Sequence, residues 1–222
     1  EIRLSLVGSE MCIRDRGYML GYSDLKDPLK LVTHLYKCGH LSVFEHIYFT
    51  FKIEGISRAC SHQLVRHRHC SFTQRSQRYC SEDGFGFVTP PSIENDEELD
   101  HYEDYMRTFV APNYAELQTM GVPNEDARYI LPNACMTSLY LSCNLRELIH
   151  IANERLCRRA QWEIRELATE MLKLCCQAAP TLFRHAGPAC CQGGCPEGKM
   201  TCGQMAAVRE RFQGIQETIK ET

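Results

Sequence analysis

One stretch of the chain concentrates side chains that bind anions. Residues 55–81 contain five arginines and three histidines but no aspartate or glutamate. Guanidinium groups grip phosphates and planar carbonyl edges through paired hydrogen bonds. The hydroxyl and amide side chains among the arginines add directional hydrogen bonds of the kind that recognise a heterocycle. This composition predicts a site for a phosphate-bearing nucleotide or a nucleic acid, and a solvated basic surface is the alternative.

The densest part of this segment, residues 66–79, reads RHRHCSFTQRSQRY. Arg66, His67 and Arg68 are followed, after a gap of seven residues, by Ser76. This pattern resembles the RHR-x7-S signature of the flavin-dependent thymidylate synthases. Further matching positions occur in the same order between about Leu29 and Phe183: Gly39-His40, Phe44-Glu45-His46, Gln63, Asp126-Ala127-Arg128, Asn144 and Arg155.

The resemblance implies an activity and its cofactors. Members of that family methylate dUMP to dTMP, with 5,10-methylenetetrahydrofolate as the carbon donor and with FAD that NADPH reduces. They are homotetramers whose active sites form at subunit interfaces. For this chain we therefore expect a methyltransferase with these ligands and this assembly, and neither a nucleic acid nor a membrane as a partner.

The resemblance also implies the site residues. The positions expected to bind dUMP are Gln63, Arg66, Gln74, Arg75, Ser76, Gln77, Arg78, Arg128 and Arg155. Those expected to contact FAD are Ser42, Arg66, His67, Arg68, Gln74, Asn144, Leu145, Arg146 and His150, with His40 near the flavin and folate. Two positions depart from the family pattern, since Gln74 stands where many members carry Glu and His150 where Asn is common.

Arg155 is the residue that we expect to be catalytic. A cation beside the N3–H and carbonyl oxygen of uracil favours the ionised ring and raises electron density at C5. Arginine does not titrate near neutral pH, so its role would be electrostatic stabilisation of developing charge. Ser76 as a nucleophile is the alternative, and it would need His67 or His69 as a base. The resemblance instead implies that Ser76 only hydrogen-bonds the pyrimidine.

The chain also contains fourteen cysteines. In a cytosolic protein these are either reduced thiols or metal ligands. Cys190, Cys191, Cys195 and Cys202, with His185 nearby, offer soft ligands for zinc or an iron–sulfur cluster, but their spacing is not a paired C-x2-C arrangement. We therefore expect a thiol-rich loop without metal and keep Cys190, Cys195 and Cys202 as candidate ligands. The rival function is a non-enzymatic nucleotide- or nucleic-acid-binding module with zinc at these cysteines.

Hydrophobic periodicity predicts the elements that position these residues. We expect helices over 27–39, 56–65, 95–120 and 144–178, a strand over 43–53 and a short strand near Phe85. Pro112 should kink or break the third helix, and Asn144 with Glu147 resembles a capping box at the start of the last.

These elements predict an α/β protein of the α+β type. We expect a single domain with a central, mostly antiparallel sheet flanked by helices that include a long C-terminal helix, as the resemblance to thymidylate synthase-complementing proteins also implies. Residues 17–188 would form this domain, truncated at its N-terminus, and 189–222 a Cys/Gly-rich loop and polar tail. Residues 1–16 lack a helical or strand period and read as an adapter-derived segment. A net charge of −3 and the lack of long apolar runs favour a cytoplasmic protein.

Overall fold

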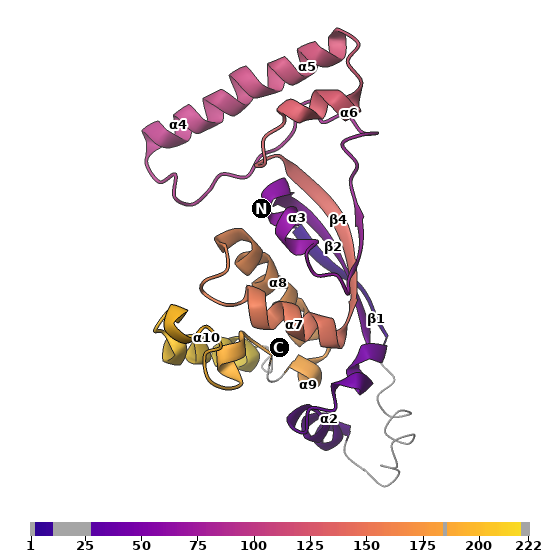
Figure 1. Cartoon of the computed structure of the whole chain (residues 1–222), viewed down its shortest axis with the longest axis vertical. Coiled ribbons are helices and arrows are strands. Elements are labelled where there is room, and N and C mark those ends of the chain that lie inside the picture. The colour runs from indigo at the N-terminus through magenta and orange to yellow at the C-terminus, as the bar shows by residue number, and fades with distance from the viewer. Residues whose placement is uncertain (1–2, 11–27, 184–185, 219–222) are drawn as a thin grey trace. The chain divides into compact units, whose positions relative to one another are not determined.

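The computed structural model describes residues 3–10, 28–183 and 186–218 (Figure 1). Its strands are β1 (Arg3–Glu10), β2 (Tyr48–Ser57), β3 (Ser71–Gln74) and β4 (Met136–Asn144). Its α-helices are α2 (Pro28–Lys37), α3 (Arg58–Leu64), α4 (Asp96–Asp104), α5 (Ala111–Thr119), α6 (Asn124–Ala127), α7 (Leu145–Arg155), α8 (Trp162–Ala178), α9 (Pro180–Phe183) and α10 (Met205–Thr218). Shorter helical turns are η1 (Leu41–His46), the π-helical η2 (Tyr105–Val110), η3 (Arg128–Ile130), η4 (Ala189–Cys191) and η5 (Gly198–Met200). No described helix is long and apolar enough to cross a membrane.

The strands form one sheet in the order β1-β2-β4-β3. β2 and β4 are antiparallel, because the amide of Arg58 bonds to the carbonyl of Cys135 and the amide of Leu145 bonds to that of Ile47. Alternate residues of both strands are buried, as expected for a sheet with one face on the core. The α+β class with an antiparallel sheet and flanking helices is thus confirmed.

Contacts divide the chain into two compact units, and the division falls within β2 and β4. Unit 1 contains Ile53–Arg66 and Phe72–Tyr140, and unit 2 contains Leu4–Lys52, His67–Ser71 and the chain from Leu141 onward. The sequence signature RHR-x7-S is therefore shared between the units, because His67 and Arg68 belong to unit 2 and Ser76 to unit 1.

The helical rod of unit 1 follows the sequence prediction. Figure 1 shows α4 and α5 as one continuous rod, joined by the π-helical turn η2. Asn95 caps the rod by accepting a hydrogen bond from the amide of Glu98 at 2.8 Å. Pro112, in the first turn of α5, has no amide hydrogen to donate, and the wider π turn lies immediately before it. The break expected at Pro112 is wrong, because the rod continues through this residue and only its helix type changes immediately before it.

The helix predicted over 144–178 is wrong as a single element, because α7 ends at Arg155 and α8 begins at Trp162. The side chain of Gln161 caps α8 by accepting hydrogen bonds from two amides of its first turn, at 3.0 and 3.1 Å. At the other end, Asn144 caps α7 through the amide of Glu147 at 2.9 Å, as predicted. α8, with 17 residues, remains the long C-terminal helix of the fold.

Two other predictions differ from the structure. The strand expected over 43–53 begins only at Tyr48, after the turn η1, and continues through Gly55, whose φ of 79° suits glycine. Residues 1–16 were expected to lack a strand, and this is wrong for Arg3–Glu10, which forms β1 beside β2. Residues 1–2 and 11–16 lie outside the described residues.

Candidate active site

A buried histidine forms the centre of the candidate site in unit 2. His67 is only 4% exposed. Its Nε2 accepts a hydrogen bond from Nε of Arg155 at 2.9 Å, and its Nδ1 lies 3.3 Å from the carboxylate of Glu147. Because Nε2 is the acceptor, the ring hydrogen is on Nδ1 and is donated to Glu147. Helix α7 presents Glu147 from its first turn and Arg155 from its last residue, so one helix holds both partners of the ring.

The surroundings keep this histidine neutral. Burial lowers the pKa of His67 below its usual value of 6.5, and the charge of Arg155 lowers it further. The carboxylates of Glu147 and Glu154 act in the opposite direction but more weakly. At neutral pH the imidazole therefore has a free electron pair for Arg155.

Arg155 is anchored along one edge of its guanidinium. Nε is bonded to His67, and Nη2 lies 3.8 Å from the carboxylate of Glu154. The side chain is 23% exposed. The anchored Nε fixes the plane of the group and leaves part of it accessible, so Arg155 can donate hydrogen bonds to a planar carbonyl edge. Arg155 therefore lies at the margin between core and solvent.

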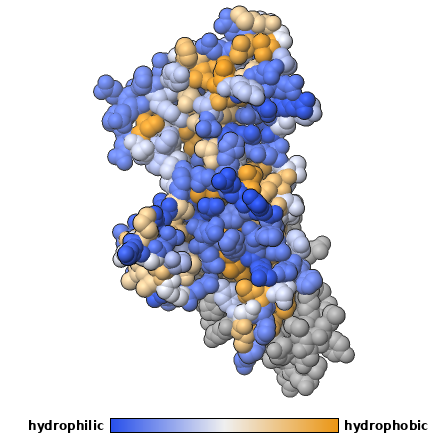
Figure 2. Space-filling model, viewed as in Figure 1, coloured by the Kyte–Doolittle hydropathy of each residue, from blue (hydrophilic) through white to orange (hydrophobic). Residues whose placement is uncertain are grey.

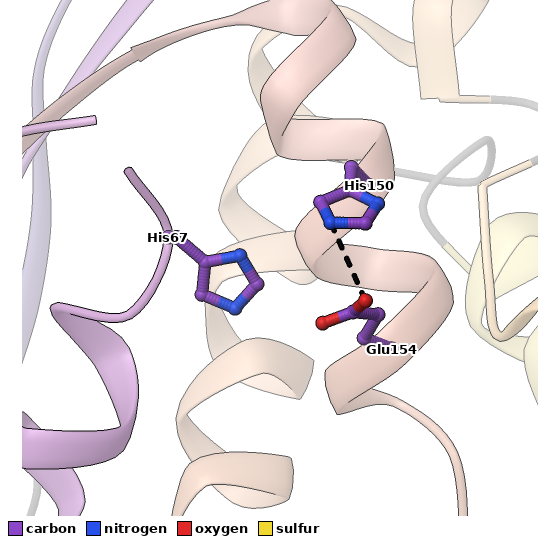
Figure 3. A group of neighbouring side chains, drawn as sticks. All are labelled: His67, His150 and Glu154. Carbon is purple, nitrogen blue, oxygen red and sulfur yellow. Dashed lines mark ion pairs between the residues drawn. The ribbon is translucent and has the colours of Figure 1, made fainter. Parts of the chain in front are cut away.

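His150 and Glu154 complete this group on the exposed side of α7. Figure 3 shows the ring of His67 facing the helix that carries both residues. Nε2 of His150 lies 3.4 Å from Glu154, and the rings of His67 and His150 are 5.7 Å apart. Donor atoms of the three residues lie within 4.8 Å of one another. We do not assign a metal here, because Nε2 of His67 already accepts from a guanidinium whose charge would repel a cation.

The start of α7 contacts the turn η1, and both carry residues expected to contact a flavin. Arg146 forms an ion pair with Glu45 of η1. Ser42, Arg146 and His150 are exposed, as are His40 and Arg68. Leu145 and Asn144 have different roles, since the Leu145 side chain is 1% exposed and the Asn144 side chain caps α7. The structure thus places these two residues as supports of the helix.

Unit 1 gathers a second group of arginines around one acid. Arg78 forms an ion pair with the carboxylate of Glu125, and Nε of Arg128 donates to the backbone carbonyl of Glu125 at 3.0 Å. Because Glu125 binds both guanidinium groups, Arg78 and Arg128 lie close together. The two arginines and one glutamate carry a net positive charge. Such a pair suits a phosphate.

The other polar residues of this segment are bonded within unit 1. Arg75 donates to the carboxylate of Glu82 at 3.0 Å, a hydrogen bond that raises the pKa of Arg75. The amide of Gln74 donates to the hydroxyls of Ser61 at 3.0 Å and Thr137 at 3.3 Å. Gln77 is buried and donates to the sulfur of Cys135. Gln74, Arg75 and Gln77 can therefore contact a ligand only through the polar atoms that these hydrogen bonds do not use.

Ser76 and Gln63 flank this segment. The hydroxyl of Ser76 accepts a hydrogen bond from the amide of Arg78 at 3.3 Å. Within the described part of unit 1, no imidazole is hydrogen-bonded to Ser76, so nothing there activates it as a nucleophile. Gln63 lies on α3, and its carbonyl accepts from the amide of Arg66, whose side chain is exposed.

Sequence reasoning missed the acids of both groups. It treated Glu147 only as a helix cap and gave no role to Glu154, Glu125 or Glu82. A signal was present on α7, because Glu147, Ile151 and Arg155 recur at four-residue steps and so share a face. For Glu125 and Glu82 no local signal existed. Arg78, the partner of Glu125, is 47 residues away in the sequence, and Arg75 reaches Glu82 only because the chain turns between them.

Comparison with known proteins identifies the family. The sequence profile of the family described as "Thymidylate synthase complementing protein" matches residues 8–181, a range that includes the basic segment and α7. The chain belongs to this family. The resemblance drawn from the signature is thereby confirmed.

Curated relatives of the family carry one common name. A protein of Geobacter sulfurreducens named flavin-dependent thymidylate synthase is 53% identical over 177 residues, covering 79% of this chain and 76% of the relative. Proteins of the same name from Clostridium tetani and Pyrococcus furiosus are 40% identical over 199 residues and 44% identical over 192 residues. These alignments cover 82% and 81% of this chain, and 80% and 78% of the relatives.

Proposed function

We propose that this enzyme is an FAD-dependent thymidylate synthase that methylates dUMP to dTMP. The observation that carries the proposal is the family match over residues 8–181. The shared name of the relatives, at 40–53% identity, supports the flavin and the product. The rival interpretation, a non-enzymatic nucleic-acid-binding module, is disfavoured by membership of an enzyme family.

The proposed reaction balances with two co-substrates. The methylene group of 5,10-methylenetetrahydrofolate replaces the hydrogen at C5 of dUMP, which leaves as a proton, and NADPH supplies the hydride that reduces the methylene to a methyl group. The equivalent of that proton and one proton from solvent are taken up by the two folate nitrogens that release the methylene. The products are dTMP, tetrahydrofolate and NADP⁺. When bound, FAD supplies the hydride carrier between NADPH and the nucleotide.

The residues of unit 2 are compatible with a flavin dinucleotide. Ser42, Arg146 and His150 are exposed and offer a hydroxyl, a guanidinium and an imidazole. Arg68, which is also exposed, adds a second guanidinium. Groups of these types bind a diphosphate and the polar edge of a ring system. We assign these four side chains to FAD, with Asn144 and Leu145 holding the helix that carries two of them.

Each arginine group, taken by itself, suits one part of the nucleotide. In this proposal Arg78 and Arg128, held together by Glu125, bind the phosphate of dUMP. The accessible part of Arg155 binds the carbonyl edge of uracil and stabilises negative charge as C5 becomes nucleophilic. Neutral His67 holds Nε of Arg155, so this cation is oriented before the substrate binds.

An apolar groove in unit 1 supports assembly into a homotetramer. Exposed side chains of η2, of η3 and of the residue that follows α5 line a cavity of about 420 Å³, among them Tyr105, Phe109, Met120 and Ile130. Figure 2 shows hydrophobic surface gathered in the upper part of the view, where Figure 1 places α5. Exposed apolar patches of this kind are typical of protein interfaces.

We further propose a cytoplasmic location, because the described cysteines are free thiols.

A reconstituted reaction tests the function. The purified chain is mixed with dUMP, 5,10-methylenetetrahydrofolate, NADPH and FAD, and dTMP is measured by mass spectrometry. We expect dTMP only in the complete mixture, and a yellow protein with flavin absorbance. Absence of both dTMP and bound flavin, together with polyanion binding that weakens steeply with salt, would overturn the proposal in favour of the rival module.

A further inference from the structure

The C-terminal segment of unit 2 folds back onto the turn that joins α7 to α8. The guanidinium of Arg159, in that turn, donates to the carbonyl of Met200 and lies 3.9 Å from the carboxylate of Glu197. The amide of Gln192 donates to the side chain of Asn153 in α7 at 3.3 Å. Residues 192–200 are therefore held against the end of α7 by side chains of the segment itself and of the turn after α7.

This folding brings together four cysteines that are distant in the sequence. Cys157 lies in the turn after α7, Cys190 in η4, and Cys195 and Cys202 on either side of η5. The pKa of the Cys190 thiol is raised, first by its burial and then by its neighbours Cys195, Cys157 and Cys202. Cys190 is buried and the other three are partly exposed. All four thiols thus lie in one neighbourhood at the surface of unit 2.

We propose that Cys157, Cys190, Cys195 and Cys202 bind one zinc ion as a tetrahedral tetrathiolate site. Four thiolates are a complete ligand set for structural zinc. Each thiol releases its proton on binding, so four protons are exchanged for one Zn²⁺. Three of the ligands lie beyond residues 8–181, the range matched by the family profile, so this site is independent of the proposed activity.

The backbone and the nearby cations suit such a site. Gly203, directly after Cys202, has a φ of 71°, a left-handed conformation that allows a tight turn beside a ligand. The guanidinium of Arg209 donates to the carbonyls of Cys190 at 2.8 Å and Gly193 at 2.6 Å. A tetrathiolate zinc site carries two net negative charges, and the guanidinium of Arg209 is a cation bonded to the backbone of one proposed ligand.

Binding requires the thiols to close around the ion. Among the described residues, only the group containing His67 has its donor atoms within 4.8 Å of one another. The four cysteines are therefore gathered but not in ligand contact, and the ion would draw them together and order the loop. Cys191 is the competing ligand, because its side chain is hydrogen-bonded to that of Cys190. Its sulfur also lies against Gly187, 3.3 Å from where a Cβ there would stand.

Metal analysis of the full chain tests the proposal. The protein is expressed with zinc, purified under reducing conditions and measured by plasma mass spectrometry and thiol titration. We expect about one zinc per chain. The single changes Cys157→Ser, Cys195→Ser and Cys202→Ser should each weaken zinc retention at least about tenfold in a chelator competition. Cobalt substitution should give the charge-transfer absorption of thiolate-bound Co²⁺ in the wild type only.

Two control variants make the assignment specific. Cys38→Ser, on the exposed surface, and Cys80→Ser, partly exposed in unit 1, should both keep their zinc. Cys191→Ser, which removes the thiol bonded to Cys190, should lose less zinc than the ligand variants. Far-ultraviolet circular dichroism checks that every variant is folded. Protein without zinc, protein with iron or disulfides in its place, or equal zinc loss in Cys191→Ser would overturn the proposed ligand set. None of these readouts depends on dTMP formation, so failure of this proposal is distinguishable from failure of the proposed function.

Discussion

At the scale of single residues, the hydrogen bond between Arg155 and His67 connects burial to chemistry. A charged imidazole could not accept from a guanidinium, so the neutral state that burial imposes on His67 is what allows Arg155 to be anchored. Glu147 then fixes the tautomer from the other side of the ring. His67 and Glu147 thereby orient the guanidinium of Arg155.

Replacing that cation should stop the reaction. We expect Arg155→Ala to lower kcat by about 10²–10³, the loss typical of removing one electrostatic donor, while flavin absorbance stays largely intact. Arg158→Ala, which removes a neighbouring exposed arginine, should leave turnover unchanged. Ser76→Ala should weaken turnover without abolishing it. The measurement is dTMP formation under saturating substrates, and full activity in Arg155→Ala would contradict the assignment.

His67 should make stability depend on pH. Its pKa in the folded protein is below 6.5, so at acidic pH the unfolded chain binds a proton that the folded chain excludes. The free energy of unfolding should therefore be at its full value above pH 6.5 and fall as the pH is lowered through 6.5, by up to about 1.4 kcal/mol for each unit between the two pKa values.

Urea unfolding at pH 7.5 and 5.5 measures this effect. His67→Gln removes the titrating group, so its loss of stability between the two pH values should be smaller than that of the wild type. His62→Gln, which changes an exposed histidine of α3, should behave as the wild type does. Identical pH dependence in His67→Gln and the wild type would contradict the prediction.

At the scale of elements, the cap of α7 supports the site. Asn144→Ala should lower the free energy of unfolding by about 1 kcal/mol, and Asn144→Ser should restore most of it. Asn95→Ala removes the corresponding cap of α4 and should lower stability by a similar amount. Because α7 carries Glu147 and Arg155, only Asn144→Ala should also reduce dTMP formation. Equal activity in the two alanine variants would show that the α7 cap has no role in the site.

Local signals predicted the ends of helices better than their interiors. The caps Asn95 and Asn144 were predictable because each depends on residues within one turn. The break between α7 and α8 was not, since the apolar repeat continues across it and Gln161 is not among the strongest capping residues. β1 was missed because its residues have no clear alternation, and only pairing with β2 identifies it as a strand.

The candidate site was predictable to a similar extent. The signature and the positions that match the family pointed to Arg155, His67 and the basic segment. The counter-charges were not predictable, because the pairing of Arg78 with Glu125 and that of His67 with Glu147 join parts of the chain that only the tertiary fold brings together. The same reason hid Cys157 from the group of C-terminal cysteines.

At the scale of the whole molecule, the apolar groove of unit 1 should control assembly. Phe109→Glu places a charge among the exposed apolar side chains of η2 and η3. If the groove is an interface, this charge must be desolvated there, so the molar mass from light scattering should fall below that of a tetramer. Thr119→Glu adds the same charge to α5 outside the groove and should leave the mass unchanged. A tetramer formed by Phe109→Glu would exclude the groove from the interface.

The short turn between α7 and α8 has an evolutionary consequence. It follows Arg155 directly, and it contains Cys157 and Arg159, which face the C-terminal segment. A substitution that shifts the backbone of this turn would alter two traits at once, namely turnover through Arg155 and metal retention through Cys157, whereas removal of an exposed side chain such as Arg158 would not. Such pleiotropy narrows the set of tolerated sequences. In a library of random variants selected for thymidine-independent growth and then screened for zinc content, this turn should therefore accept fewer backbone-altering changes than α4, in which no residue is buried.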